Sequence, residues 1–189
     1  MLNYADEHGR LPPAVVYGRD GKALYSWRVL LLPYLEEQDL HRQFHLDEPW
    51  DSDHNSQLID RMPALYAPPG SKKKLVLPGY TFCHLFVGGG TAFEDPRGQL
   101  LKDLTRGTSN TLLIIEAGEP VPWTKPEELV YVPGQPLASL PGPFRDIFRL
   151  TLADGSRRHL DRDTDEAELR ELIAGEQAPG EVSQRITVP

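Results

Sequence analysis

Basic residues, cysteines and long apolar runs are all scarce in this chain. Its 189 residues include 20 Lys and Arg against 28 Asp and Glu, for a net charge of -8. No stripe of basic residues is interleaved with aromatic ones, so nucleic-acid binding is not expected. The single cysteine, Cys83, rules out a disulfide framework and a cysteine-based metal site. No run of about 18 apolar residues is present, so we expect no transmembrane helix within these residues.

Proline and glycine are plentiful, at 18 and 16 residues. Both punctuate regular structure, which predicts many turns and long irregular loops. The chain is long enough for a proper core, and we find neither an internal repeat nor a linker that would divide it. We therefore expect a single domain over residues 1–189, with a flexible tail at 176–189.

Four segments have helical signals. Residues 1–7 read as a helix end that stops at Gly9, and 54–62 is a weaker candidate. Ser26 can cap a helix that continues to about Phe44. Pro33 removes a backbone hydrogen bond there, which predicts a kink or two abutting pieces. A last helix is predicted at 164–174, with Asp163 as its N-cap and Glu166 completing a capping box.

Four apolar or alternating runs predict strands at 80–87, 111–116, 147–153 and 156–160. Asp154-Gly155 lies between the last two, and this dipeptide favours a two-residue hairpin turn with positive φ at both positions. Helices followed by antiparallel strands and a final helix give an α+β fold.

A polar turn of small residues, at 107–111, leads directly into the apolar strand that ends at Glu116. It consists of Gly107, Thr108, Ser109, Asn110 and Thr111. Ser109 resembles the nucleophile of a hydrolase elbow, but the last glycine of that motif is missing and the turn precedes a strand rather than a helix. We expect these side chains to bond local backbone groups, so that replacing Asn110 with Ala would cost about 1 kcal/mol.

Three groups of residues are candidate metal ligands. Asp161, Asp163 and Asp165 alternate as in a calcium loop, but the loop's required glycine is replaced and its twelfth position is a leucine. A helix cap explains Asp163 without a metal, so no cofactor is expected and calcium is the alternative. His41 and His45 are spaced as on one helix face, without the glutamate of a metalloprotease helix. A weaker acidic group is Asp47, Glu48, Asp51, Asp53 and His54.

Several long strings carry a resemblance to a known family. They are NYADEHGRLPP, SWRVLLLPYLE, FHLDEPWDSDHN, GTSNTLLIIEAGE, VPWTKPEEL and ADGS. Together they resemble the domain of unknown function 1559, a family abundant in planctomycete bacteria whose members look like type II secretion pseudopilins. The resemblance covers residues 1 to about 175. Phe144 stands where the family's H-x9-DG signature has histidine, and Arg106 stands where an aspartate is commoner.

The resemblance implies a type IV pilin-like fold, in which an N-terminal helix packs on an antiparallel sheet. Residues 1–8 would be the remnant of that helix, whose apolar membrane-anchoring part is absent from this sequence. It further implies a non-enzymatic, structural or interaction role in the cell envelope, with other pilin-like proteins as partners. The alternative is a module for carbohydrate or calcium outside the cytoplasm, for which Trp50, Trp123 and Tyr131 would offer aromatic platforms.

Overall fold

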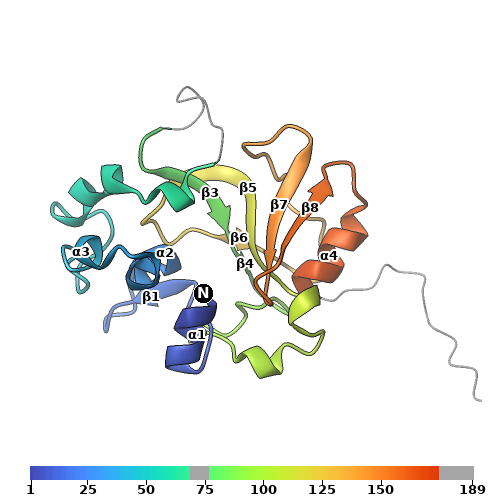
Figure 1. Ribbon diagram of the computed structural model, residues 1–189, viewed down its shortest axis with the longest axis horizontal. Helices are drawn as coiled ribbons and strands as arrows, with labels where there is room; N and C mark the ends of the chain where they lie inside the picture. The colour runs from blue at the N-terminus through green and yellow to red at the C-terminus, as the bar shows by residue number, and fades with distance from the viewer. Residues whose placement is uncertain (69–76, 175–189) are drawn as a thin grey trace, which may run out of the picture.

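A four-stranded antiparallel sheet forms the centre of the computed structural model, which describes residues 1–68 and 77–174 (Figure 1). Its strand order is β3-β5-β7-β8, with bounds Tyr80–His84, Leu112–Pro122, Ile147–Leu152 and Arg157–Asp161. Each neighbouring pair is antiparallel. The α+β prediction and the four-strand sheet are therefore confirmed, and β5 continues beyond its predicted end.

The end of the first predicted strand is wrong, because the chain leaves the sheet after His84. Phe86–Val87 forms β4, which pairs in parallel with β6, Leu129–Val130. The backbone N–H of Leu85 instead donates to the carboxylate of Glu128 at 2.7 Å. A second small sheet, formed by β1 (Val15–Tyr17) and β2 (Ala23–Ser26), was not predicted.

The hairpin between β7 and β8 has a different turn from the predicted one. Thr151 pairs with Arg157, and the N–H of Leu152 donates to Ser156 at 2.9 Å. Three residues, Ala153 to Gly155, therefore form the loop. Gly155 has φ 84°, whereas Asp154 does not have a positive φ. This is the three-residue loop with glycine in the left-handed region rather than a type I′ turn.

The first helix agrees with its prediction and the second does not. α1 spans Leu2–His8 and ends at Gly9, which has φ 74°. Ser26 does cap a helix by accepting from Arg28 N, but that helix, α2, spans only Trp27–Leu30. It is followed by a 3-10 helix, η1, at Leu32–Leu35 and by α3 at Gln38–His41. The main break is at Glu36, whose φ of 63° is left-handed, rather than at Pro33.

The last helix, α4, spans Glu166–Ala174, and its cap is Asp165 rather than the predicted Asp163. The Asp165 carboxylate accepts from the N–H of Ala167 at 2.9 Å. Shorter 3-10 helices are η2 (Asn55–Arg61), η3 (Ala64–Tyr66), η4 (Leu101–Asp103) and η5 (Thr108–Asn110). The predicted tail at 176–189 lies outside the described residues.

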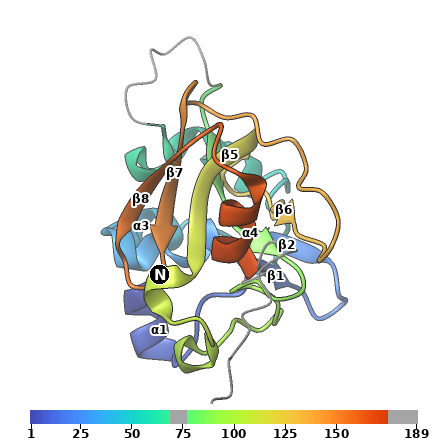
Figure 2. The same cartoon turned by 90° about the vertical axis from the view of Figure 1, so that its right-hand side faces the viewer.

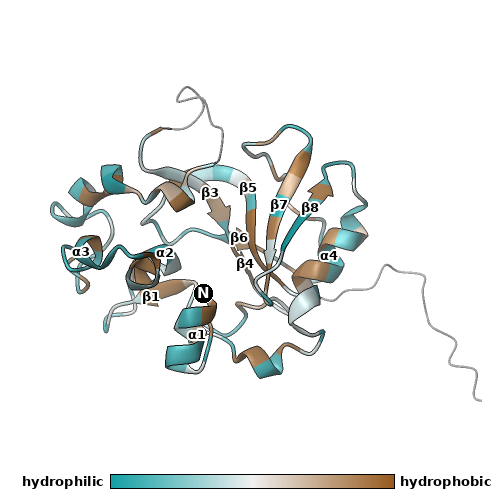
Figure 3. Ribbon diagram, viewed as in Figure 1, coloured by the Kyte–Doolittle hydropathy of each residue, from teal (hydrophilic) through white to brown (hydrophobic). Residues whose placement is uncertain are grey.

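Two apolar cores lie on either side of the sheet. Alternate residues of β7, namely Phe148, Leu150 and Leu152, pack with Leu169 and Ile173 of α4 (Figure 2). The other core joins the N-terminal half of the chain to β5 through Leu113. In Figure 3 the hydrophobic residues concentrate on α2 and the central strands. None of the helices in the described residues has the length and apolar character that a membrane crossing needs.

Candidate functional site

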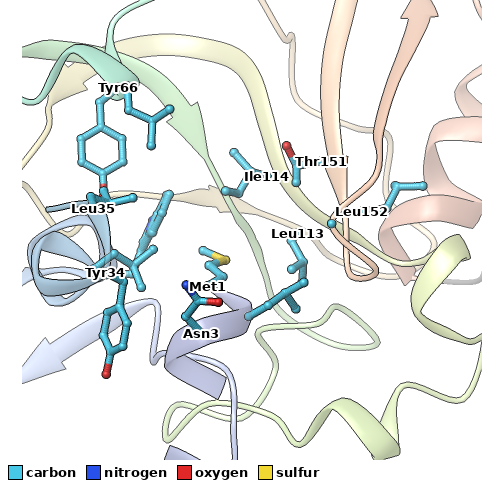
Figure 4. A pocket seen from close by; sticks show the side chains of 14 residues that line it. Met1, Asn3, Tyr34, Leu35, Tyr66, Leu113, Ile114, Thr151 and Leu152 are labelled. Carbon is cyan, nitrogen blue, oxygen red and sulfur yellow. The ribbon is translucent and has the colours of Figure 1, made fainter. Parts of the chain in front are cut away.

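An apolar groove of about 340 Å³ lies between the first helix and the open face of the sheet. Its volume is within the range of ligand-binding clefts. Five parts of the fold line it: α1, the α2–η1 segment, η3, β5 and the β7–β8 hairpin (Figure 4). The lining residues are Met1, Leu2, Asn3, Trp27, Leu31, Tyr34, Leu35, Leu65, Tyr66, Leu113, Ile114, Thr151, Leu152 and Gly155.

The walls of the groove follow from local sequence. Trp27 and Leu31 are one helical turn apart, so they present neighbouring side chains from the same face. Ile114 and Thr151 are register partners on β5 and β7, where β5 has an irregularity between Leu112 and Ile114. That irregularity places Leu113 in the N-terminal core while Leu112 packs with the α4 core.

α1 is held against η1 by a cluster of polar side chains at the edge of the groove. The Tyr34 hydroxyl donates to Glu7 Oε2 at 2.7 Å, and His8 Nε2 lies 3.0 Å from the same hydroxyl. Tyr4 stacks on His8 with ring centroids 4.1 Å apart. Desolvation and the Glu7 carboxylate raise the pKa of Tyr34 to about 12, so the hydroxyl keeps its proton and its donor role.

The groove offers apolar contact and very little chemistry. Of its side chains, Asn3, Thr151 and two tyrosines are polar, and the Tyr66 hydroxyl already donates to Arg28 O at 2.9 Å. It contains no carboxylate, imidazole or thiol among its lining residues. Such a surface can hold an apolar side chain or segment.

A buried ion pair lies below the groove and ties the N-terminal half to the loop before β6. Arg28 Nη1 is 2.9 Å from Glu128 Oε1, and both side chains are almost fully buried. Trp27 Nε1 also donates to this carboxylate at 2.9 Å. The guanidinium of Arg28 further donates to the backbone carbonyl of Cys83. The strings SWR and KPEE, about 100 residues apart, therefore meet in one polar centre.

Two neighbouring groups in this centre have shifted pKa values of opposite sign. Burial raises the pKa of Glu128 to about 7, even though Arg28 and the other donors oppose this. Burial, aided by the charge of Arg28, lowers the pKa of His84 to about 4. His84 Nε2 lies 3.0 Å from the carbonyl of Glu119, and Nδ1 lies 3.8 Å from Glu128 Oε2, beyond hydrogen-bond distance. The lowered pKa leaves the ring neutral at pH 7.

The polar turn and the hairpin loop, two separate sequence motifs, are bonded to each other. The N–H of Ala153 donates to Thr111 O at 2.8 Å, and the N–H of Asp154 donates to Thr108 O at 3.1 Å. Within the turn, Thr111 Oγ1 donates to Gly107 O at 3.0 Å. Gly155 then sets the hairpin tip against α1, because a side chain there would lie 3.3 Å from Leu2.

The strength of the bonds within this turn differs from our expectation. Asn110 is exposed, and its side chain donates to Arg106 O over 3.4 Å. The predicted loss of about 1 kcal/mol for Asn110→Ala is typical of a buried hydrogen bond. Because Thr111 is fully buried and Asn110 is not, we now expect this loss at Thr111. Ser109 is exposed on the turn that precedes β5. Glu116 is half-buried on β5, and burial raises its pKa.

No local sequence pattern predicted the role of Arg106. Its Nη2 donates to Ile173 O at 3.2 Å, and its Nη1 donates to Glu171 O. These are carbonyls of the last turn of α4, which have no partner within the helix. Arg106 thus joins the polar turn to the C-terminal end of α4, where a cation is favoured.

The calcium hypothesis has no support in the geometry. In residues 1–68 and 77–174, no group of three or more His, Cys, Asp or Glu side chains could hold a metal ion. This covers both Asp161, Asp163 and Asp165 and the acidic group at Asp47–His54. Asp165 is used as the helix cap. His41 and His45 do not share a helix, because α3 ends at His41.

The proposed aromatic platform is also wrong, because two of its three members lie in the core. Trp123 and Tyr131 are fully buried, and Trp123 stacks on Tyr66 at 5.9 Å. Trp50 remains half-exposed, with Lys125 Nζ 6.0 Å from its ring centre. Cys83 is half-buried, and burial raises the pKa of its thiol to about 11, so it is a structural rather than a reactive cysteine.

The fold is α+β, with an apolar groove beside its first helix. Residues 1–83 match the model of a family described as a protein of unknown function, DUF1559. The search of curated proteins and the search of solved structures each gave no match.

Proposed function

We propose that the domain is a non-enzymatic, pilin-like structural or interaction component of the cell envelope. In this proposal the groove binds an apolar helix, and this helix anchors the protein and carries its assembly contacts. The position of the groove supports it most directly. Met1, Leu2 and Asn3 of α1 line the groove, together with Ile114 and Thr151 of the sheet. A helix that ran on into Met1 would therefore lie along the sheet face.

The chemistry of the groove also favours a helical occupant. Each large aliphatic side chain seated in it would contribute about 1.5–3 kcal/mol. Leu65 is 66% exposed at the rim, which is a large exposure for an apolar residue beside an apolar cleft. An amphipathic or apolar helix in a hydrophobic groove is a recurring mode of recognition. The partners would be pilin-like or envelope proteins that share or contact this helix.

A double-mutant cycle tests whether such a helix binds in the groove. An apolar helix of about 20 residues is placed before Met1, and the free energy of unfolding is compared with that of the present chain in the same detergent. We expect stabilisation of at least about 1.5 kcal/mol, which Leu65→Asp abolishes. Leu77→Asp is the matched control, since Leu77 is equally exposed and does not line the groove. Equal stabilisation in all three proteins would contradict a helix in this groove.

The envelope location needs its own measurement. Cells that express the complete gene are fractionated, and the protein is followed with an antibody against this domain. We expect it in the envelope fraction, and in the soluble fraction once the preceding apolar segment is deleted. A full-length protein found only in the cytoplasmic fraction would contradict the proposed location, whatever the result at the groove.

A further inference from the structure

Two histidines in the segment after α3 are stacked face to face. The ring centroids of His45 and His54 are 3.6 Å apart, and the ring planes differ by 1°. Each ring has an oxygen beside one nitrogen. His45 Nδ1 lies 2.9 Å from Glu48 Oε1, and His54 Nε2 lies 2.7 Å from the carbonyl of Gln43. Both rings reach the surface, so solvent protons have access to them.

The stack joins the two ends of one loop, residues 43–55. Inside this loop Asn55 is fully buried and accepts from the N–H of His45 at 3.0 Å. Its amide nitrogen donates to the carbonyls of His45 and Pro49 at 2.9 and 3.1 Å. The histidine stack lies beside these bonds, so parting the rings would expose the Asn55 bonds to water.

The charges around the stack are mostly negative. Glu48 faces His45 directly, and the Ser52 hydroxyl, followed by His45, lowers the pKa of Glu48. The same loop carries the carboxylates Asp47, Asp51 and Asp53. From η2, Arg61 donates to the Gln43 side chain, and on α3 Arg42 pairs with Asp39 at 3.2 Å. Carboxylates therefore outnumber cations around the stack.

A second proton would place two cations face to face. Their mutual repulsion opposes the closed stack. We infer that the His45–His54 stack is a proton-operated clasp. It keeps the 43–55 loop closed while one ring is neutral and releases the loop when both rings are protonated. This device is independent of the groove and of the function proposed for it.

Trp50 makes the opening measurable. It lies in the 43–55 loop and is half-exposed, and its N–H donates to Leu24 O at 2.6 Å. The other tryptophans, Trp27 and Trp123, are fully buried. Quenching of tryptophan fluorescence by acrylamide therefore reports mainly on Trp50, and amide hydrogen exchange of His45 reports on the Asn55 bond.

The experiment compares about pH 7.5 with about pH 5, the range over which histidines change charge. In the wild type we expect His45 amide exchange, corrected for its intrinsic rate, to rise about tenfold at the lower pH, with stronger quenching. His54→Phe keeps an aromatic ring that takes no proton, and it should abolish both changes. His159→Phe, at an exposed histidine of β8, should keep them.

Three results would overturn the clasp. The first is no change in the wild type, and the second is the same change in His54→Phe. The third is a simultaneous loss of protection in β5, since this would show global unfolding rather than opening of one loop.

Discussion

Arg28 is a fully buried cation whose partners come from two distant segments and from the neighbouring Trp27. It pairs with Glu128, bonds the Cys83 carbonyl and lies 4.9 Å from the centre of the Trp27 ring. A buried charge without its partner is strongly destabilising, whereas a neutral replacement of both partners is much less so. The pair therefore holds the two halves of the domain in one arrangement.

Replacing Arg28 with Met should lower the free energy of unfolding by about 3–5 kcal/mol, because buried Glu128 loses the cation that stabilises its charged form. The double variant Arg28→Met, Glu128→Gln should recover part of this loss, since it removes the buried carboxylate together with its cation. A single amide oxygen then replaces the two oxygens that accept from Trp27 and Leu85. Urea unfolding measures both. An Arg28→Met protein within about 1 kcal/mol of wild type would show that the pair contributes little.

His84 should make stability depend on pH in a definite direction. Its pKa is lowered from 6.5 in the unfolded chain to about 4 in the fold, so folding opposes its protonation. The stability it contributes is complete above about pH 6.5 and falls as the pH drops toward 4, by at most about 1.4 kcal/mol per pH unit.

The raised pKa of Glu128 has the opposite effect on stability, because its contribution grows as the pH falls from about 7 to 4.5. The pH dependences of the two groups therefore partly cancel in the wild type. The difference in unfolding free energy between wild type and His84→Gln isolates the histidine. We expect this difference to shift against the wild type as the pH falls from 6.5. A difference that stays constant from pH 7 to 4.5 would contradict the buried, neutral histidine.

At the scale of elements, the junction of the polar turn with the hairpin loop fixes one wall of the groove. Thr111→Val removes the hydroxyl that donates to Gly107 but keeps the shape of the buried side chain. It should cost about 1 kcal/mol. Asn110→Ala, at an exposed position with a 3.4 Å bond, should cost only a few tenths. Thermal unfolding compares them, and a larger loss at Asn110 would reverse our assignment.

The elements that the sequence predicted well are those fixed by local pattern. The strands show alternation, so β7 and β8 appeared at nearly their observed bounds. Gly9 correctly marked the end of α1. The segment 26–44 has an apolar face at helical spacing, but Glu36 adopts a left-handed conformation and divides it. The conformation of this segment also depends on the burial of Trp27 and Arg28 against Glu128. No local sequence pattern reveals such a distant contact.

The candidate site was harder to predict than the fold. The apolar run that follows the polar turn predicted β5, which lines the groove. The groove is also lined by α1, η3 and the β7–β8 hairpin, and no local sequence pattern shows that these elements meet. Trp123 and Tyr131 were misplaced because a tryptophan or tyrosine in a proline-rich segment has the same local sequence whether it is exposed or buried. Arg106 was read as a departure from a motif, yet it bonds the end of α4.

At the scale of the whole molecule, the proposed function predicts that the domain without an added apolar helix associates only weakly. The domain itself has a net charge of -8, and like charges oppose close association. Its exposed apolar surface beside the groove is limited, so any pairing through it should be weak.

Sedimentation velocity over a wide range of concentration tests this claim most directly. The present chain should be largely monomeric, with at most a weak dimer that dissociates on dilution. The same chain with an apolar helix before Met1, examined in detergent, should form larger assemblies, and Leu65→Asp should reduce them more than Leu77→Asp does. A tight oligomer of the present chain that persists on dilution would contradict the account, because its assembly contacts would then lie elsewhere on the domain.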